Sequence, residues 1–494
     1  MTQNAIVGEK PKNIRHQVFA GVRWTGLSQV AQQLINLLWS VVMARLLLPD
    51  DFGLLAMASV FTGIVFFVLD LGLSAVIIQK PELETRQISS IFWLNVLAGV
   101  LMTLVGIVLA APIAWFYRNP AVQPVVVVLS LNFLVFSLSA TQSSLLHRQM
   151  DFKALELRTL VGLIVGTAAS IAMAVAGLGV WSLVGRLLIA GIASCLLLWS
   201  VSGWRPGWYF RWADVKGWVG FSNEVLASNL LAHVGRNADN LLIGRFVGAM
   251  SLGYYAMAYN VMMFPVQRFS QVLASVLFPA LSRLQEDTTR LTCGWFRAAR
   301  LIGAVTIPLM VGLVVLAEPF VRVVYGEKWL PVVPVLRILA VSGAVQSLGI
   351  LDGTVLLALG HSRLRLQLTA FAVGVAVISF IVGLPGGVIG VAGCFVAANL
   401  CTSIVTLLVT LRCLQLSAAA YLRNLRGVLL AACAMGAAEL LIRALPLAPA
   451  PLLLVAVPAG IALYIISLQV WAPAVVAEAL QFVPERLRRR IQPA

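Results

Sequence analysis

Long apolar segments alternate with short polar breaks along almost the whole chain of 494 residues. A helix that crosses a lipid bilayer needs about 20 mostly apolar residues. By that criterion the pattern predicts fourteen membrane-spanning helices. They lie near residues 20–44, 53–78, 88–112, 122–146, 155–176, 180–201, 218–243, 252–279, 301–324, 331–357, 366–384, 388–411, 427–445 and 451–471. The sequence therefore predicts an all-α polytopic membrane protein.

The composition excludes a water-soluble enzyme. Hydrophobic residues make up 60% of the chain and charged residues 11%, whereas soluble domains are about 45–50% apolar and about 25% charged. The net charge of +16 is spread thinly among apolar segments, so we expect no nucleic-acid partner. The six cysteines form no CxxC pair and the four histidines lie far apart. We therefore expect no metal site and no bound cofactor.

The basic residues test the helix count, because the cytoplasmic loops of membrane proteins are enriched in Lys and Arg. With fourteen helices, 25 of the 35 Lys and Arg residues fall on the side of both termini and 6 on the opposite side. A miscounted helix would disrupt this alternation. We therefore expect both termini in the cytoplasm. Residues 1–17 show no cleavable signal sequence, so the first helix should remain in the membrane.

An internal repeat relates the two halves of the chain. At an offset of 200 residues, 5 of 15 positions coincide between residues 44–58 and 244–258, where chance gives about one match. The offset spans six predicted helices, an even number, so both halves should have the same orientation. Parallel repeats of this kind build two-lobed transporters with a cavity between the lobes. The extra residues of the second half fit a polar insert near Arg283 to Arg297, which we expect to be an amphipathic surface segment.

The repeat and the loops together predict the domain organisation. We expect, in order, a cytoplasmic N-terminal segment, an N-lobe of helices 1–6, a cytoplasmic linker, a C-lobe of helices 7–12, two additional helices and a basic cytoplasmic tail. Their predicted bounds are 1–17, 18–201, 202–217, 218–411, 412–472 and 473–494.

The first helix of each half has an unusually polar face. Polar residues recur there every three or four positions, which places them on one side of the helix. The matched sets are Gln29, Gln33, Asn36 and Ser40 in the first half, and Asn229, His233, Arg236 and Asn240 in the second. Such a face avoids lipid tails. It forms either a hydrogen-bonded helix seam or the wall of a hydrophilic cavity, and its recurrence in both halves favours the cavity.

Several charges lie inside predicted spans, where each costs about 2.5–3.5 kcal/mol unless a partner, water or a ligand compensates it. Arg236 lies three residues before Asp239, so these two could neutralise each other along the helix. Arg268 and Arg337 have no such neighbour, and Arg186 lies near enough to a helix end to be solvated. Carboxylates on other helices that could pair with these cations are Asp70, Asp352 and Glu439.

A cationic cavity favours an anionic substrate, and the planar guanidinium fork suits phosphate. Amide side chains add hydrogen-bonding groups for a hydroxyl-rich cargo. The predicted cavity residues are Arg236, Asp239, Arg268, Asn240, His233, Asn229, Gln33, Asn36, Gln29 and Gln271. Arg45 and Arg245 occupy matched positions near helix ends. They either extend to the membrane interface or act as gate residues.

Several motifs resemble those of one transporter family. They are Ala44-Arg45-Leu46-Leu47-Leu48-Pro49-Asp50-Asp51-Phe52-Gly53, Asp70-Leu71-Gly72-Leu73-Ser74, Gly179-Val180-Trp181-Ser182-Leu183-Val184, Asp239-Asn240-Leu241-Leu242-Ile243-Gly244-Arg245, Phe278-Pro279-Ala280-Leu281-Ser282-Arg283 and Tyr325-Gly326-Glu327-Lys328-Trp329. With these motifs the chain resembles the Wzx-type oligosaccharide flippases of the polysaccharide transporter family, nearest the branch of colanic-acid exporters. That family lies in the superfamily that also holds the MATE drug antiporters. The resemblance covers residues from about 15 to 415.

The resemblance implies two six-helix lobes with two extra helices, and alternating access to a V-shaped cavity. It implies a polyprenyl-diphosphate-linked oligosaccharide as the cargo, moved from the cytoplasmic to the outer leaflet of the bacterial inner membrane. The partners it implies are this glycolipid and membrane lipids, together with a polysaccharide polymerase and glycosyltransferases. The resemblance transfers no catalytic residue, so we expect a protein that is not an enzyme.

Two other functions compete with this interpretation. A cation-coupled antiporter of MATE type would have twelve helices and an acidic cavity, which the predicted count and the Arg-rich spans do not favour. A membrane polymerase or ligase acting on the same glycolipids would need a large outer loop or paired acidic residues, and the sequence shows neither.

Overall fold

The computed structural model describes residues 14–69, 76–78, 80, 83–215, 233, 235–271, 282–283 and 287–480. These residues are mainly helical, and no β-strand occurs among them. The chain forms two compact units, Met1–Gly253 and Tyr254–Ala494, and each is described by itself.

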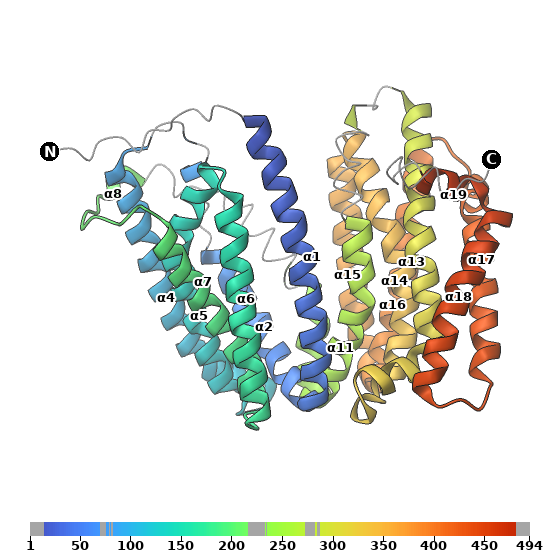
Figure 1. Ribbon diagram of the computed structural model, residues 1–494, viewed down its shortest axis with the longest axis horizontal. Coiled ribbons are helices and arrows are strands. Elements are labelled where there is room, and N and C mark those ends of the chain that lie inside the picture. Colours follow the sequence, from blue (N-terminus) through green and yellow to red (C-terminus); the bar gives the residue numbers. More distant parts are fainter. Residues whose placement is uncertain are drawn as a thin grey trace. The chain divides into compact units, whose positions relative to one another are not determined.

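The first unit is a bundle of long helices with two short ones. Its elements are α1 (Ile14–Leu46), α2 (Pro49–Leu69), α4 (Thr85–Tyr117), α5 (Val122–Arg148), α6 (Phe152–Val175), α7 (Val180–Val201), α8 (Trp212–Val215), α10 (Ala238–Phe246) and the start of α11 (Ala249–Pro265). Helix α4 packs along α5, α6 packs along α7, and α1 packs on α6 (Figure 1). Successive helices therefore form antiparallel pairs, as the short loops between them require.

Small residues let α4 and α5 approach closely. A Cβ added to Gly99 or to Gly106 would meet a serine hydroxyl of α5 at 2.2 or 2.1 Å. Between these glycines, Thr103 Oγ1 donates to the carbonyl oxygen of Ser130 at 3.1 Å. Because lipid tails are as apolar as Leu, membrane helices associate through such close packing and hydrogen bonds rather than through the hydrophobic effect.

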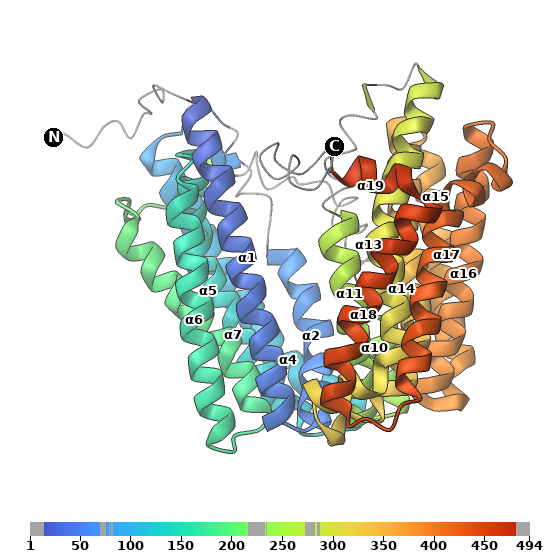
Figure 2. The ribbon, with the colours of Figure 1, turned by 45° about the vertical axis from the view of Figure 1, so that its right-hand side comes forward.

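The second unit contains the remaining helices. They are the rest of α11, the π-helix η1 (Val266–Gln271), α13 (Thr288–Val324), the 3-10 turn η2 (Glu327–Trp329), α14 (Val332–Ala358), α15 (Ser362–Gly383), the 3-10 turn η3 (Leu384–Gly386), α16 (Gly387–Cys413), α17 (Ala418–Arg443), α18 (Pro449–Trp471) and α19 (Pro473–Leu480). Helix α13 packs against α14, α17 and α18 (Figure 2). It is therefore the central helix of this unit.

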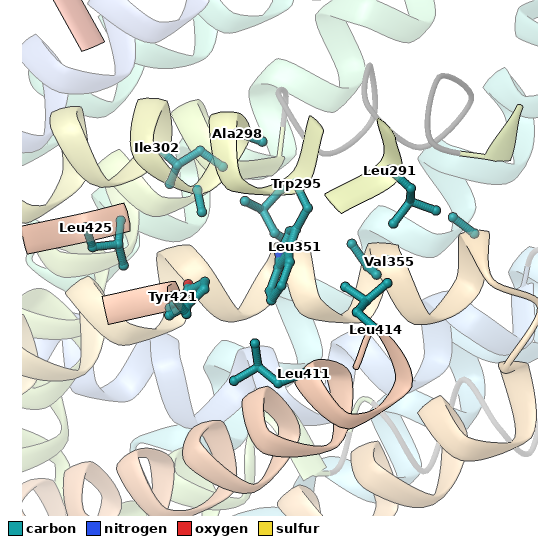
Figure 3. Close-up of a cluster of buried hydrophobic side chains, with 12 residues drawn as sticks. Leu291, Trp295, Ala298, Ile302, Leu351, Val355, Leu411, Leu414, Tyr421 and Leu425 are labelled. Carbon is teal, nitrogen blue, oxygen red and sulfur yellow. The ribbon is translucent and has the colours of Figure 1, made fainter. Parts of the chain in front are cut away.

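The first turns of α13 coincide with one predicted feature. The segment from Arg283 to Arg297 was expected to be an amphipathic surface segment, and from Thr288 onward it is the first part of one continuous helix with the following span. Its apolar side is buried: Trp295 is 0% exposed and stacks on Tyr421 of α17, with ring centroids 5.2 Å apart (Figure 3). The amphipathic pattern arises because one side packs on neighbouring helices while the other presents Arg290 and Arg297.

The predicted spans agree with the described helices. Nine stretches of the described chain are long and apolar enough to cross a bilayer by length and composition, and one of these, residues 362–413, contains both α15 and α16. The predicted spans 53–78 and 252–279 begin in α2 and α11 and continue into residues outside the described part of the chain. The other predicted spans also coincide with a described helix except the seventh, 218–243. Most of that span lies outside the described residues, and α10 covers its end. The protein is an all-α polytopic membrane protein.

Candidate functional site

The polar face of α1 meets a buried arginine of α7. The Nη2 of Arg186 donates to Oδ1 of Asn36 at 2.5 Å. The same guanidinium lies over the indole ring of Trp39, 3.6 Å from its centroid. Trp39 is three residues after Asn36 and so shares its side of the helix. The amide oxygen and the aromatic face together stabilise one cation inside the first unit.

This contact corrects the expectation that Arg186 is solvated near a helix end. Helix α7 begins at Val180, so Arg186 lies almost two turns inside it, and only 9% of the residue is exposed. A buried charge requires partners, and α1 supplies them. The seam continues on α6, because Trp39 Nε1 donates to Ser170 Oγ at 3.2 Å.

The other residues of this stripe differ in exposure. Gln29 is exposed, whereas Gln33 is half-buried. The side-chain oxygen of Gln33 is buried and has no hydrogen-bond partner among the residues that the structure describes. The stripe thus combines a hydrogen-bonded seam at Asn36 with an unused buried acceptor one turn earlier.

The described residues of the matched polar set in the second half lie in the first unit, where His233 contacts α2. His233 Nε2 is hydrogen-bonded to the carbonyl oxygen of Val60 at 3.1 Å, and the ring fills the space above Gly63, where a Cβ would come within 2.5 Å. Asn237 Nδ2 donates to the carbonyl oxygen of His233 at 2.9 Å, and Asn240 Nδ2 donates to Asn237 Oδ1 at 3.3 Å. These side chains form a continuous polar strip along one segment.

Asp239 and Arg236 have different environments. Asp239 is buried in the first turn of α10, and its Oδ1 accepts a hydrogen bond from the backbone N–H of Asn240 at 2.8 Å. Arg236 precedes the N-cap residue Asn237 and is exposed. A carboxylate in the first turn is favoured by the helix dipole, whereas the nearby guanidinium is available to other groups.

The two candidate gate residues also differ. Arg45 is exposed near the end of α1, and Arg245 is half-buried in the last turn of α10. The Arg245 guanidinium lies 5.8 Å from the centroid of Phe116 and 5.7 Å from that of Phe246. Next to it, Gly244 is packed against the ring of Tyr117. A gate role for these arginines stays a prediction.

Two glycines at repeat-matched positions form a tight helix crossing. A Cβ added to Gly53 would lie 1.8 Å from the carbonyl oxygen of Ala249, and one added to Gly253 would lie 1.9 Å from that of Pro49. Residues 49 and 249 are themselves matched by the offset of 200. The first turns of α2 and α11 therefore cross so that the glycine of each helix lies against the backbone of the other.

The remaining predicted residues are dispersed or undescribed. In the second unit, Arg337 Nη2 lies 3.9 Å from Glu318 Oε2, and Asp352 is buried on α14 next to the Trp295 and Tyr421 rings. Asn229 and Asp70 lie outside the described residues, as do the side chains of Arg268 and Gln271. The sequence analysis did not identify Trp39 as a contact of Arg186, and it did not predict that Arg186 is buried. The spacing of three residues between Asn36 and Trp39 was the available indication that both lie on one side of the helix.

The fold and its intramembrane polar residues define an all-α polytopic membrane protein. The chain belongs to the family described as "Polysaccharide biosynthesis protein", which matches residues 42–334. Among curated relatives, it is 28% identical over 355 residues to the teichuronic acid biosynthesis protein TuaB of Bacillus subtilis (strain 168), covering 71% of this chain and 73% of TuaB. It is 26% identical over 405 residues to the lipopolysaccharide biosynthesis protein WzxC of Escherichia coli (strain K12), covering 81% and 82%.

Two solved structures show the same fold. The lipid II flippase MurJ in an inward closed conformation matches with a TM-score of 0.71 and 15% identity, over 92% of this chain and 100% of MurJ. An inward-facing multidrug resistance transporter of the MATE family, within the MOP superfamily, matches with a TM-score of 0.60 and 15% identity, over 78% and 94%. At 15% identity, these two likenesses concern the fold.

Proposed function

We propose that the chain is a flippase that moves a polyprenyl-diphosphate-linked oligosaccharide from the cytoplasmic to the outer leaflet of the bacterial inner membrane, for exopolysaccharide or lipopolysaccharide biosynthesis. The observation that supports this most strongly is the family match, combined with a fold shared over nearly the whole chain with a lipid II flippase. Curated relatives named for teichuronic acid, lipopolysaccharide and succinoglycan biosynthesis support a polysaccharide precursor as the substrate class.

The proposed transport cycle is alternating access without covalent chemistry. The substrate contains an anionic diphosphate and a hydroxyl-rich glycan. Arg236 is exposed beside the polar strip of His233, Asn237 and Asn240, so this segment offers both a guanidinium and amide groups. We propose that Arg236 attracts the diphosphate or acidic sugars and that the amides bind the sugar hydroxyls. The same role is proposed for Arg268 of the second unit, whose side chain lies outside the described residues.

A cation-coupled antiporter of MATE type is the second candidate, because a MATE transporter shares the fold. The charge of the described segment favours the flippase: a cationic drug would gain nothing from an exposed arginine, whereas a diphosphate would. The two candidates differ in substrate, so a transport assay separates them.

The proposed function implies enzymes that act before and after the flippase, and an orientation of the chain in the membrane. The polymerase and glycosyltransferases of the same pathway would supply and consume the glycolipid, and both termini of the flippase would lie in the cytoplasm. The excess of Lys and Arg on the side of the termini supports this orientation.

The deciding experiment uses the purified full-length chain in vesicles loaded with a fluorescent polyprenyl-diphosphate oligosaccharide. We expect the fraction of lipid accessible to a membrane-impermeant quencher to change at a rate that depends on the protein. If the protein instead exchanges protons or sodium ions for a cationic dye across the vesicle membrane and moves no glycolipid, the result would support the antiporter. New glycosidic bonds in the same mixture would show a polymerase or ligase.

A further inference from the structure

Three arginines surround one glutamate in the second unit, and we name these residues the Glu318 cluster. Arg443 Nη2 lies 3.0 Å from Glu318 Oε2, Arg337 Nη2 lies 3.9 Å from the same oxygen, and Arg322 Nη2 lies 3.4 Å from Oε1. Arg443 Nη1 also donates to the carbonyl oxygen of Val315 at 3.1 Å. Three arginine side chains from α13, α14 and α17 thus converge on one carboxylate.

The cluster has more positive charge and more donors than its carboxylate can use. Three guanidinium groups and one carboxylate leave a net charge of +2 within the four residues. Nε of Arg322 and both Nε and Nη2 of Arg337 are buried and make no hydrogen bond to the residues that the structure describes. Arginine donors that are removed from water need an acceptor. The unused donors therefore need a further acceptor, and the net positive charge of the cluster favours an anionic one.

Stability does not explain this arrangement. The four side chains are between 32% and 41% exposed, and ion pairs at such exposure contribute about 0–1 kcal/mol each. One glutamate could be satisfied by a single bidentate arginine. Two further arginines next to it repel each other and Arg443, so their convergence favours a ligand.

The position of the cluster favours an anion that belongs to a lipid. It lies where α13 ends, α14 begins and α17 ends, an end that the charge distribution places outside the cytoplasm. One turn along α14 from Arg337, Val341 is exposed, and one turn along α17 from Arg443, Leu440 is exposed. Cationic groups at helix ends with apolar side chains one turn deeper match a lipid's phosphate and acyl chain.

We propose that the Glu318 cluster binds the phosphate group of a lipid at the outward-facing membrane surface. The phosphate would accept hydrogen bonds from Arg322 and Arg337, while Glu318 accepts one from Arg443. The phosphate could come from an anionic phospholipid or from the diphosphate of a lipid-linked glycan, which share this chemistry. The site belongs to the second unit, and the segment around Arg236 that the proposed function uses belongs to the first.

Native mass spectrometry of the full-length chain in mild detergent tests the proposal. Phosphatidylglycerol and zwitterionic phosphatidylcholine are offered at equal concentration, and the lipids retained are counted. We expect the wild type to prefer phosphatidylglycerol, and the variant with both Arg337→Gln and Arg443→Gln to retain about tenfold less of it, the effect of about 1.4 kcal/mol. A parallel titration adds undecaprenyl diphosphate. Displacement of phosphatidylglycerol assigns the site to the glycan carrier, and no displacement assigns it to the phospholipid.

Two matched variants keep the proposal falsifiable. Arg118→Gln removes one positive charge from another predicted outward helix end, in the first unit, and should leave retention unchanged. Glu318→Gln keeps all three arginines and removes the competing anion, so it should raise retention of phosphatidylglycerol. The proposal fails if the double variant retains as much lipid as the wild type, if Arg118→Gln lowers retention equally, or if Glu318→Gln lowers it. If the double variant does not insert into the membrane, the retention of phosphatidylglycerol by the Glu318→Gln variant decides whether the proposal holds.

Discussion

At the residue scale, the contact between Arg186 and α1 shows how a charge is accommodated inside a membrane helix. Its guanidinium uses one amide oxygen and one aromatic face instead of a carboxylate. A neutral acceptor avoids burying a second charge, whose desolvation would offset much of the attraction. The seam is therefore stabilised without a formal ion pair between Arg186 and another helix of the described chain.

Replacing the acceptor tests this contact. We expect Asn36→Ala to lower stability by about 1.5–3 kcal/mol, because a buried guanidinium loses its hydrogen-bond acceptor. The thermal unfolding of the purified protein in detergent measures the change. Ser40→Ala is the control, since Ser40 lies on the same face but its hydroxyl bonds to the carbonyl oxygen of Leu37 in its own helix. Equal melting temperatures for Asn36→Ala and the wild type would contradict this account.

The proposed cationic segment gives a second prediction at this scale. Arg236→Glu should abolish glycolipid transport by repelling the diphosphate, while Arg236→Lys, which keeps the charge but loses the planar fork, should reduce transport only partly. Complementation of a strain that lacks its own flippase measures export, and membrane insertion is checked for each variant. Normal export by a well-inserted Arg236→Glu protein would show that Arg236 is structural.

Sequence patterns located polar residues more reliably than their partners. Helical spacing alone placed Gln33, Asn36 and the matched residues around His233 on polar faces. It could not show that Asn36 contacts Arg186, because the two residues are 150 positions apart and no alternation or motif links them. Likewise, the spacing of four residues relates Arg322 to Glu318 on one helix, but nothing in the sequence shows that Arg337 and Arg443 of other helices converge on the same carboxylate. Contacts between distant segments depend on helix packing, which a local pattern does not contain.

At the element scale, the crossing of α2 and α11 depends on two small residues. Backbone atoms occupy the space where each Cβ would lie, so no side-chain rotation can relieve a substitution. Helices without Cβ atoms at a contact can approach more closely than others, as in small-residue membrane motifs.

Substitution of either glycine should force the crossing apart. We expect Gly53→Ala and Gly253→Ala each to destabilise the protein by about 1–3 kcal/mol, the usual cost of overpacking. Gly26→Ala in α1 is the control, because no atom lies within 4 Å of its Cβ position. The variant with both changes should lose less stability than the sum of the losses in the two single variants, because one widened crossing accommodates both methyl groups. Strict additivity in thermal unfolding would contradict a shared crossing.

The long helix α13 gives another prediction at this scale. Trp295 is enclosed by α14, α16 and α17 residues such as Leu351, Leu411 and Tyr421 (Figure 3). Trp295→Ala should therefore cost about 3–5 kcal/mol, seen as a lower melting temperature or loss of inserted protein. Trp115→Ala, at a side chain that is 83% exposed, should have little effect. Similar losses for both would contradict the burial of the first turns of α13.

At the scale of the whole molecule, hydropathy and charge anticipated most of the helices. Their apolar lengths are fixed by bilayer thickness, so the sequence contains that information locally. Helix ends were less predictable: α13 and α17 begin at Thr288 and Ala418, earlier than the apolar runs suggested, because polar turns continue a helix beyond its apolar stretch.

The topology can be tested directly. In a variant without its six native cysteines, a single cysteine at Arg363 should react with impermeant maleimide only after the membrane is permeabilised. A single cysteine at Glu327 should react in intact cells. Both positions are exposed, so access depends on the side of the membrane. Labelling of the Arg363 position in intact cells would show that the predicted orientation is wrong.

The reciprocal crossing of Gly53 and Gly253 also has an evolutionary meaning. If the two repeats arose by duplication of one gene, two copies of the ancestral polypeptide would have met at this place across a two-fold axis, and one glycine codon would have supplied both sides of the contact. After fusion the two codons could mutate separately, yet each is still restrained by the backbone opposite it. Selection at one position therefore depends on the residue at the other, and the two glycines should be retained or lost together among descendants.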